Sequence, residues 1–147
     1  MRIEFRKAVL PQEIRGLLAF DRKVFPAADR FDAAYWNEVE SWWLIAGKTK
    51  VGCCAFEKKK NTLYISTTGI LPRFQNQGFG ALLKSWEVAY ARYHSYSRVQ
   101  THSRKSNARM IALNRQFGFR VVRTIPRYYS DPVESAVLME LSFKNAN

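Results

Sequence analysis

The feature that most constrains the fold is a glycine-containing junction at residues 71–81, which joins a strand-like segment to a helical one. The segment before it, residues 63–70, is rich in residues that favour strands, and Pro72 ends that segment. After it, residues 78–93 carry apolar side chains at helical spacing, namely Phe79, Leu82, Leu83, Trp86, Tyr90 and Tyr93. A strand that passes through a loop into an amphipathic helix predicts a protein of the α/β class.

The segments before the junction predict two helices and an antiparallel meander. Residues 2–9 alternate between apolar and polar side chains, as a half-buried strand does. Pro11 suits a helix start, and residues 31–40 form a second short helix. The spacing of the next segments predicts strands at 42–46, 51–56 and 63–70, with turns at 47–50 and 58–61.

The segments after the long helix predict a mixed sheet in a single domain over residues 1–147. Strands are expected at 98–103, 120–125 and 135–143. A helix is expected at 106–117, with Ser106 as its N-cap and Gly118 as its C-terminal stop. The whole is a mixed, mostly antiparallel sheet of six to seven strands flanked by about four helices.

The junction has the properties of a phosphate site. Unpaired backbone N–H groups and the helix dipole favour an anion there. Gly78 and Gly80 leave room for a close approach to the backbone. The P-loop pattern is absent, and Leu83 occupies the place of the third glycine of the dinucleotide fingerprint. A plain tight turn remains the alternative on these residues alone.

The charge of the chain favours anionic partners. Lys and Arg number 24 against 12 Asp and Glu, a net charge of +12, and residues 88–130 hold nine basic side chains and no acid. Such a field attracts polyanions. An acidic or nucleic-acid-associated partner is therefore one expectation, a merely soluble basic surface is another, and polycationic amines are poor partners.

Other classes of protein are disfavoured. Cys53 and Cys54 are adjacent in an expected strand, so their side chains point to opposite faces and reduced thiols are expected. No metal-ligand spacing exists, so no metal is expected. No apolar run reaches the roughly 18–20 residues that span a bilayer, and the N-terminus lacks an apolar leader, so a cytoplasmic protein without a membrane partner is expected.

Two motifs resemble those of the GNAT superfamily of N-acetyltransferases. The first is Gln-x-x-Gly-x-Gly at residues 75–80. The second is Asn-Ala-Arg-Met-Ile-Ala-Leu-Asn-Arg-Gln-Phe-Gly-Phe at residues 107–119, which resembles the family's N-x-x-A-x-x-L-(Y/N)-x-x-x-G-F. They occur in the family's order and spacing, and the resemblance covers nearly the whole chain. Phe25-Pro26 and residues 127–139 are most similar to the ribosomal-protein and peptide N-terminal acetyltransferases.

The resemblance implies a GNAT-like fold that binds acetyl-coenzyme A. The strand carrying Thr68, Gly69 and Ile70 would run beside the pantetheine arm, and strands 63–70 and 98–103 would splay apart. Asn107 would contact the cofactor or cap its helix. Arg104, Lys105 and Arg109 would either meet the ribose phosphate or remain solvated. The loop around the pyrophosphate would comprise Gln75, Asn76, Gln77, Gly78, Phe79, Gly80 and Ala81.

The resemblance also suggests which residues transfer protons. His102 lies where the related enzymes carry a catalytic glutamate and is the candidate base, the alternative being a polar strand histidine. Asn114 replaces the family's tyrosine acid and would at most hydrogen-bond the sulfur. Tyr128 or Tyr129 would replace that acid, line the acceptor groove with Phe25, or only pack at a sheet edge. A mechanism without a general acid is a further alternative, because a thiolate is a tolerable leaving group. The second histidine, His94, is expected at the surface.

The sequence thus predicts an acetyl-CoA-dependent N-acetyltransferase in which a primary amine of a protein or peptide attacks the thioester directly. One alternative is a non-catalytic GNAT-fold module that binds acyl-CoA or docks on nucleic acid. Another is an acetyltransferase for small-molecule amines. A monomer and a homodimer are both compatible with the sequence.

Overall fold

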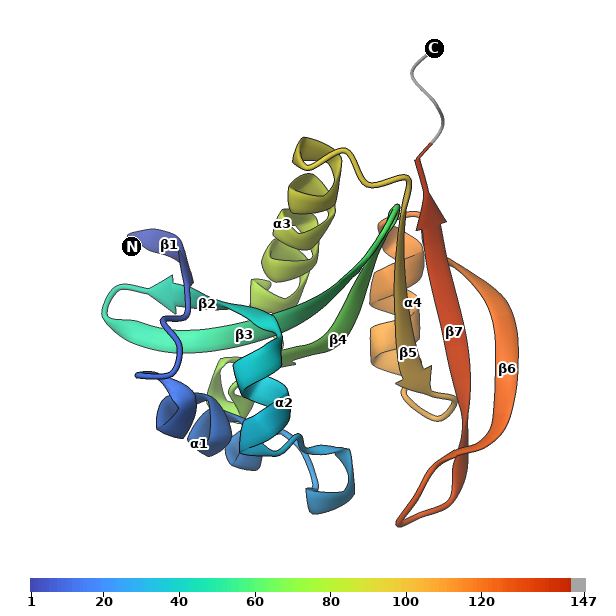
Figure 1. The fold of residues 1–147 in the computed structure, drawn as a ribbon, viewed down its shortest axis with the longest axis horizontal. Coiled ribbons are helices and arrows are strands. Elements are labelled where there is room, and N and C mark those ends of the chain that lie inside the picture. Colours follow the sequence, from blue (N-terminus) through green and yellow to red (C-terminus); the bar gives the residue numbers. More distant parts are fainter. Residues whose placement is uncertain (144–147) are drawn as a thin grey trace. The chain divides into compact units, whose positions relative to one another are not determined.

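The computed structural model describes residues 1–143, which divide into two compact units. The first comprises Met1–Glu57 and Thr67–Leu83, and the second comprises Lys58–Ser66 and the chain from Lys84 onward. Strands β3 and β4 and helix α3 contribute residues to both. The seven strands of the sheet follow the order β1-β2-β3-β4-β5-β7-β6 (Figure 1). The predicted mixed sheet is confirmed, whereas the single domain stays a prediction.

The first unit pairs β1, β2 and β3 in antiparallel fashion. The bounds are β1 Ile3–Lys7, α1 Ile14–Val24, α2 Ala33–Glu38, β2 Glu40–Ala46 and β3 Thr49–Lys59. Helices α1 and α2 lie next to each other (Figure 1). Their buried side chains Leu17, Phe20 and Trp36 form one core with Trp43 of β2. This core is built from aromatic rings, and Phe20 meets Trp43 edge to face with centroids 5.7 Å apart.

The second unit contains the remaining strands and α4. The bounds are β4 Thr62–Ile70, α3 Phe79–Tyr93, β5 Arg98–Arg104, α4 Ala108–Gln116, β6 Arg120–Tyr129 and β7 Glu134–Ser142. Strand β5 pairs with β4 in parallel and with β7 in antiparallel fashion, and β7 pairs with β6. The β4–β5 ladder runs only from Thr62↔Arg98 to Ile65↔Thr101, although both strands continue beyond it.

The two faces of the second unit's strands differ because side chains alternate along β5. Val99, Thr101 and Ser103 are buried, whereas Gln100 and His102 are half-buried. Asn114 of α4 contacts Met139, which lies opposite Thr101, so α4 packs on the buried face.

A buried ion pair lies in the part of α3 that belongs to the second unit. It joins Lys84 Nζ to Glu87 Oε1 at 2.8 Å, with the two side chains 1% and 0% exposed. The Lys84 ammonium also lies 5.3 Å from the centroid of the Phe119 ring. Each charge of the pair compensates the other, because a single buried charge without a partner would cost roughly 3–5 kcal/mol of stability.

Several boundaries differ from expectation. Asn107, not Ser106, is the N-cap of α4, because its Oδ1 accepts from the N–H of Met110 while the N–H of Ser106 donates to Glu134. Strand β3 continues through Lys59, where a turn was expected. Gly118 ends α4 with φ +93°, as predicted.

Cys53 and Cys54 are both buried free thiols. Within residues 1–143, no helix is long and apolar enough to cross a membrane.

Candidate functional site

The junction between β4 and α3 is held open by side chains of its own loop. A 3-10 turn at Pro72–Phe74 follows β4. The side-chain amide of Gln75 donates to the carbonyl of Ile70 at 2.9 Å, and that of Gln77 donates to the carbonyl of Arg73 at 3.0 Å. Both hydrogen bonds lie within this segment, and neither uses a backbone N–H group of residues 76–81.

The backbone amides of the loop are available to a ligand. The N–H group of Gln75 donates to Pro72, and helical bonding begins with Leu82, which donates to Gly78. Between them, the six amides from residue 76 to residue 81 make no hydrogen bond to any part of the chain that the structure describes. Gly78 adopts φ +90° and a Cβ there would meet nothing within 4 Å. The predicted loop is therefore an open cluster of donors at the first turn of a helix, which suits a phosphate.

Gly69 is required by close packing at the end of β4. A Cβ at this position would lie 3.0 Å from Val24 Cγ1 and 3.1 Å from Phe25 Cε2. The carbonyl of Phe25 accepts a hydrogen bond from Arg30 Nε at 2.7 Å, which fixes the loop after α1. The first unit thus brings the segment of Thr68, Gly69 and Ile70 together with Phe25.

In the second unit, His102 is sandwiched by two tyrosines. Its Nδ1 lies 2.6 Å from the hydroxyl of Tyr64 on β4. Its ring stacks on that of Tyr128 on β6, with centroids 4.7 Å apart and planes at 15°. Sequence reasoning found His102 and Tyr128 but missed Tyr64. Strand alternation gives the face of Tyr64 but not which strand lies beside it, so the contact was not visible in the sequence.

The surroundings of His102 favour its neutral form. Burial of the ring lowers the pKa of His102 from its usual 6.5, and the positive charges of Arg123 and Lys59 lower it further. The ammonium of Lys59 lies 4.8 Å from the centre of the Tyr64 ring. A neutral imidazole with one ring nitrogen engaged by Tyr64 keeps the other nitrogen for a second partner.

Arg104 and Tyr129 hold the turn between β6 and β7. The Arg104 guanidinium lies 4.7 Å from the centre of the Tyr129 ring and donates to the carbonyls of Pro132 and Ser130 at 2.9 and 2.8 Å. It also lies 3.2 Å from Glu134. Arg104 is therefore engaged by this turn, and its contact with a ribose phosphate stays a prediction.

The two asparagines of the second motif lie on α4 and have different surroundings. Asn107 caps the helix through Oδ1. Asn114 is fully buried, its amide nitrogen lies 3.6 Å from Met139 Sδ, and its Oδ1 has no hydrogen-bond partner in residues 1–143. A hydrogen bond from Asn114 to a thioester sulfur stays a prediction.

No group of three or more His, Cys, Asp or Glu able to hold a metal ion occurs in the described part of the chain. The polar groups of the loop at residues 76–81 and around His102 are amide, imidazole and phenol groups, which suit a phosphate and a proton better than a cation.

Comparison with known proteins agrees with this geometry. Residues 12–119 match the acetyltransferase (GNAT) family. The structure is similar to the ribosomal-protein-S18-alanine N-acetyltransferase from Escherichia coli, with a TM-score of 0.87 and 17% identity over 99% of this chain and 98% of that one. It is also similar to Arabidopsis thaliana NAA60 in complex with a bisubstrate analogue, with a TM-score of 0.80 and 18% identity over 97% and 100% of the two chains.

A third similar structure is a GNAT family acetyltransferase from Elizabethkingia anophelis with acetyl-CoA bound. Its TM-score is 0.77, with 18% identity over 96% of this chain and 98% of that one. At these identities the structural matches establish the fold.

Proposed function

Because this chain belongs to the acetyltransferase (GNAT) family, we propose that it moves an acetyl group from acetyl-CoA to the α-amine of a protein or peptide N-terminus. The observation that carries the proposal is the neutral His102, held between Tyr64 and Tyr128. Two of the similar structures, the ribosomal-protein-S18-alanine N-acetyltransferase and NAA60, also favour an N-terminal acceptor.

Acetyl-CoA would be held by the open amides of residues 76–81. The pyrophosphate accepts hydrogen bonds from these amides at the N-terminus of α3. The segment of Thr68, Gly69 and Ile70 at the end of β4 would run beside the pantetheine arm. The cofactor supplies an activated thioester, and the protein supplies orientation and proton transfer.

His102 would accept the proton from the attacking amine. The pair at 2.6 Å allows either partner to donate, so the tautomer is assigned by chemistry. If Nδ1–H donates to the Tyr64 oxygen, Nε2 keeps a lone pair and acts as the base, directly or through a water. If Tyr64 donated instead, Nε2 would carry the hydrogen and accept nothing. We assign the first arrangement, with Tyr64 as a positioning residue.

The balance of the reaction is simple. The amine lone pair forms a C–N bond to the thioester carbonyl, the C–S bond breaks, and coenzyme A leaves as a thiolate. The proton lost by the amine goes to His102. Tyr128 is the better candidate than Asn114 for returning a proton to the thiolate, because its side chain is 47% exposed and stacks on His102.

An α-amine suits such a base better than a lysine does. Its pKa of about 7.7–8.0 lies about one unit above neutral pH, so deprotonation costs roughly 1.4 kcal/mol. A lysine near 10.4 lies about 3.4 units above it, which costs roughly 4.6 kcal/mol. The mild basicity of a neutral imidazole therefore matches an N-terminal acceptor.

Mass spectrometry of peptide acetylation tests the proposal. One peptide has a free N-terminus and no lysine, its partner has a blocked N-terminus and one internal lysine, and a panel of small amines is run beside them. We expect the first to be acetylated and His102→Ala to lower its kcat at least 100-fold with little change in CoA affinity. Acetylation of lysine or small amines alone would contradict an N-terminal acceptor.

A further inference from the structure

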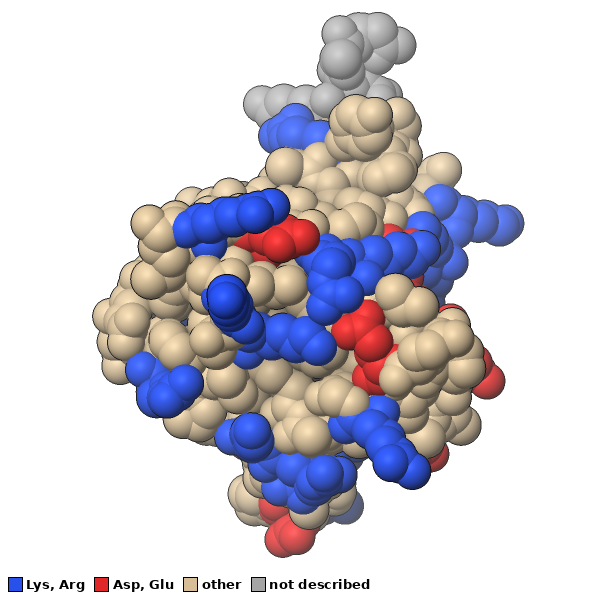
Figure 2. Space-filling model, turned by 90° about the vertical axis from the view of Figure 1, so that its left-hand side faces the viewer, with Lys and Arg blue, Asp and Glu red and all other residues tan. Residues whose placement is uncertain are grey.

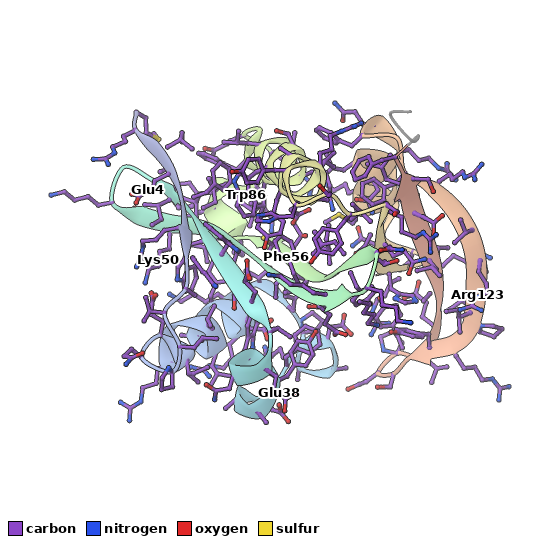
Figure 3. The ribbon with its side chains drawn as sticks, turned by 45° about the horizontal axis from the view of Figure 1, so that its top comes forward. Glu4, Glu38, Lys50, Phe56, Trp86 and Arg123 are labelled. Atoms are coloured by element: carbon purple, nitrogen blue, oxygen red, sulfur yellow. The ribbon has the colours of Figure 1, made fainter. Side chains whose placement is uncertain are left out.

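The half-exposed face of the second unit's strands is strongly cationic around His102. In the register, His102 lies opposite Leu138 of β7, and Leu138 lies opposite Arg123 of β6. Because directly opposed residues share a face, Arg123 and His102 share one face, two strands apart. Figure 3 shows Arg123 on β6, the edge strand of the sheet. Lys59, at the end of β3, adds a second cation above the ring of Tyr64.

The same face carries further arginines. Gln100 lies opposite Glu140, which lies opposite Arg120, and Arg98 lies two residues before Gln100 on the same side of β5. The hydrogen bond from Gln100 lowers the pKa of Glu140 most. The hydrogen bond from Ser142 and the positive charges of Arg98 and Arg120 lower it further. The carboxylate of Glu140 is thus engaged by an amide, a hydroxyl and guanidinium charges.

The second carboxylate near this site is occupied as well. Glu134 accepts hydrogen bonds from Arg104 at 3.2 Å and from the N–H of Ser106 at 2.7 Å. These contacts lower the pKa of Glu134. The carboxylates of Glu134 and Glu140 are therefore both engaged, and Arg123 places a further positive charge on the same face.

The excess positive charge reaches His102 itself. Burial lowers the pKa of the imidazole most, and the positive charges of Arg123 and Lys59 lower it further, so the potential of both reaches the ring. A positive potential beside the base disfavours an ammonium and favours a neutral amine, and it attracts carboxylates that follow the amine. It repels a peptide whose next residues are Lys or Arg, and it repels polyamines.

We propose that the acceptor is an acidic N-terminal segment, in which a free α-amine is followed within the first few residues by Asp or Glu, and that Arg123 and Lys59 select it. This rests on the proposed function, because it assigns the amine to the His102 site. The carboxylates of the acceptor lie over β6 and the end of β3, while the amine points to Nε2 of His102.

Three peptides of one length test this preference. Each begins with alanine, followed by Asp-Asp, Asn-Asn or Lys-Lys and then by an identical neutral sequence. At low salt we expect kcat/KM to fall at least tenfold from the Asp to the Asn peptide and further to the Lys peptide, mainly through KM, with a smaller ratio at 0.3 M salt. Equal values for the Asp and Asn peptides would overturn the proposal.

A matched pair of variants locates the selection. Arg123→Gln removes one charge beside His102, and Lys48→Gln removes one charge from the exposed turn between β2 and β3. We expect the Asp-to-Asn ratio to shrink several-fold in Arg123→Gln and to stay at the wild-type value in Lys48→Gln. Using a ratio cancels any change in the strength of His102 as a base. The same ratio in both variants would refute a local role for Arg123.

Binding without turnover separates this proposal from the proposed function. Fluorescence anisotropy of labelled peptides, with coenzyme A present, reports docking alone. Selective binding of the Asp peptide without acetylation would refute the N-terminal transferase and support the acidic docking surface. Acetylation of all three peptides at equal rates would refute only the charge preference. A short single-stranded RNA that displaced the Asp peptide at lower concentration than unlabelled peptide, through Arg123, would make nucleic acid the better occupant and overturn the proposal.

Discussion

An imidazole serves as a base only while it is uncharged, and the surroundings of His102 favour that form. Burial and the two neighbouring cations lower its pKa below 6.5. Below its pKa the ring holds a proton and accepts none, so a lowered pKa extends the active form toward acid pH. The same cations thus keep the base free and draw in acidic acceptors.

This arrangement predicts a pH profile. In wild type, kcat/KM for the Asn-Asn peptide should begin to fall near the pKa of its α-amine, about 7.7–8.0, and should show a second acid limb, from His102, below pH 6.5. Arg123→Gln removes a charge that penalises the imidazolium, so the pKa rises toward 6.5 and the second limb moves to higher pH. Lys48→Gln should leave the second limb in place. A second limb that persists unchanged in His102→Ala would assign it to another group.

Gly78 allows a test of the phosphate loop that separates binding from folding. At φ +90° an alanine is strained by about 1–2 kcal/mol, and the same holds for Gly118 at φ +93°. We expect Gly78→Ala and Gly118→Ala both to lower the free energy of unfolding, but only Gly78→Ala to weaken coenzyme A binding, by at least tenfold in calorimetry. Equal affinities in the two variants would move the phosphate away from this loop.

At the scale of elements, the order of strands and helices could be predicted, because apolar side chains repeat at one spacing in helices and at another in strands. Strand β6 is longer than the sequence predicts. The sequence predicts a strand that ends at Ile125, just before Pro126, yet β6 continues to Tyr129. An edge strand tolerates proline, because the missing N–H faces no neighbour, and the register shifts between Ile125 and Tyr129 absorb the irregularity. Edge position is a property of the sheet and is absent from the local sequence.

The residues of the candidate site likewise fall into two groups, those that the sequence indicates and those that only the sheet arrangement brings together. The loop at residues 75–81 and His102 could be found because a motif carries them. Tyr64 could not, since its contact depends on β4 and β5 being parallel neighbours. Arg123 was counted only as one of many basic residues, and its place beside His102 follows from the β5–β7–β6 register.

The start of α4 separates two roles of Asn107. Its Oδ1 caps the helix, so Asn107→Ala should cost about 1 kcal/mol of stability. Asn107→Asp keeps the capping oxygen and removes the amide N–H donors. If that amide binds the cofactor, Asn107→Asp should retain the melting temperature and still lose coenzyme A affinity several-fold. Wild-type affinity in Asn107→Asp would leave the residue with capping alone.

At the scale of the whole molecule, the net charge of +12 dominates. Figure 2 shows basic side chains spread over one face, with fewer acidic ones among them. Like charges repel in the compact state, and this repulsion reaches about 30 Å at 0.01 M salt but only about 8 Å at 0.15 M.

We therefore expect the melting temperature to rise as sodium chloride increases over this range, measured by circular dichroism. Lys48→Glu, which lowers the net positive charge by two, should show a smaller rise. A melting temperature that falls with salt would indicate that native ion pairs outweigh the repulsion.

The two cysteines have a practical consequence. Both lie in β3 between β2 and β4, 2% and 0% exposed, and the chain has no others. A thiol-reactive dye added to the native enzyme during turnover would label released coenzyme A at once and the protein only when β3 opens. One reagent thus records catalysis in a fast phase and breathing of the central sheet in a slow one.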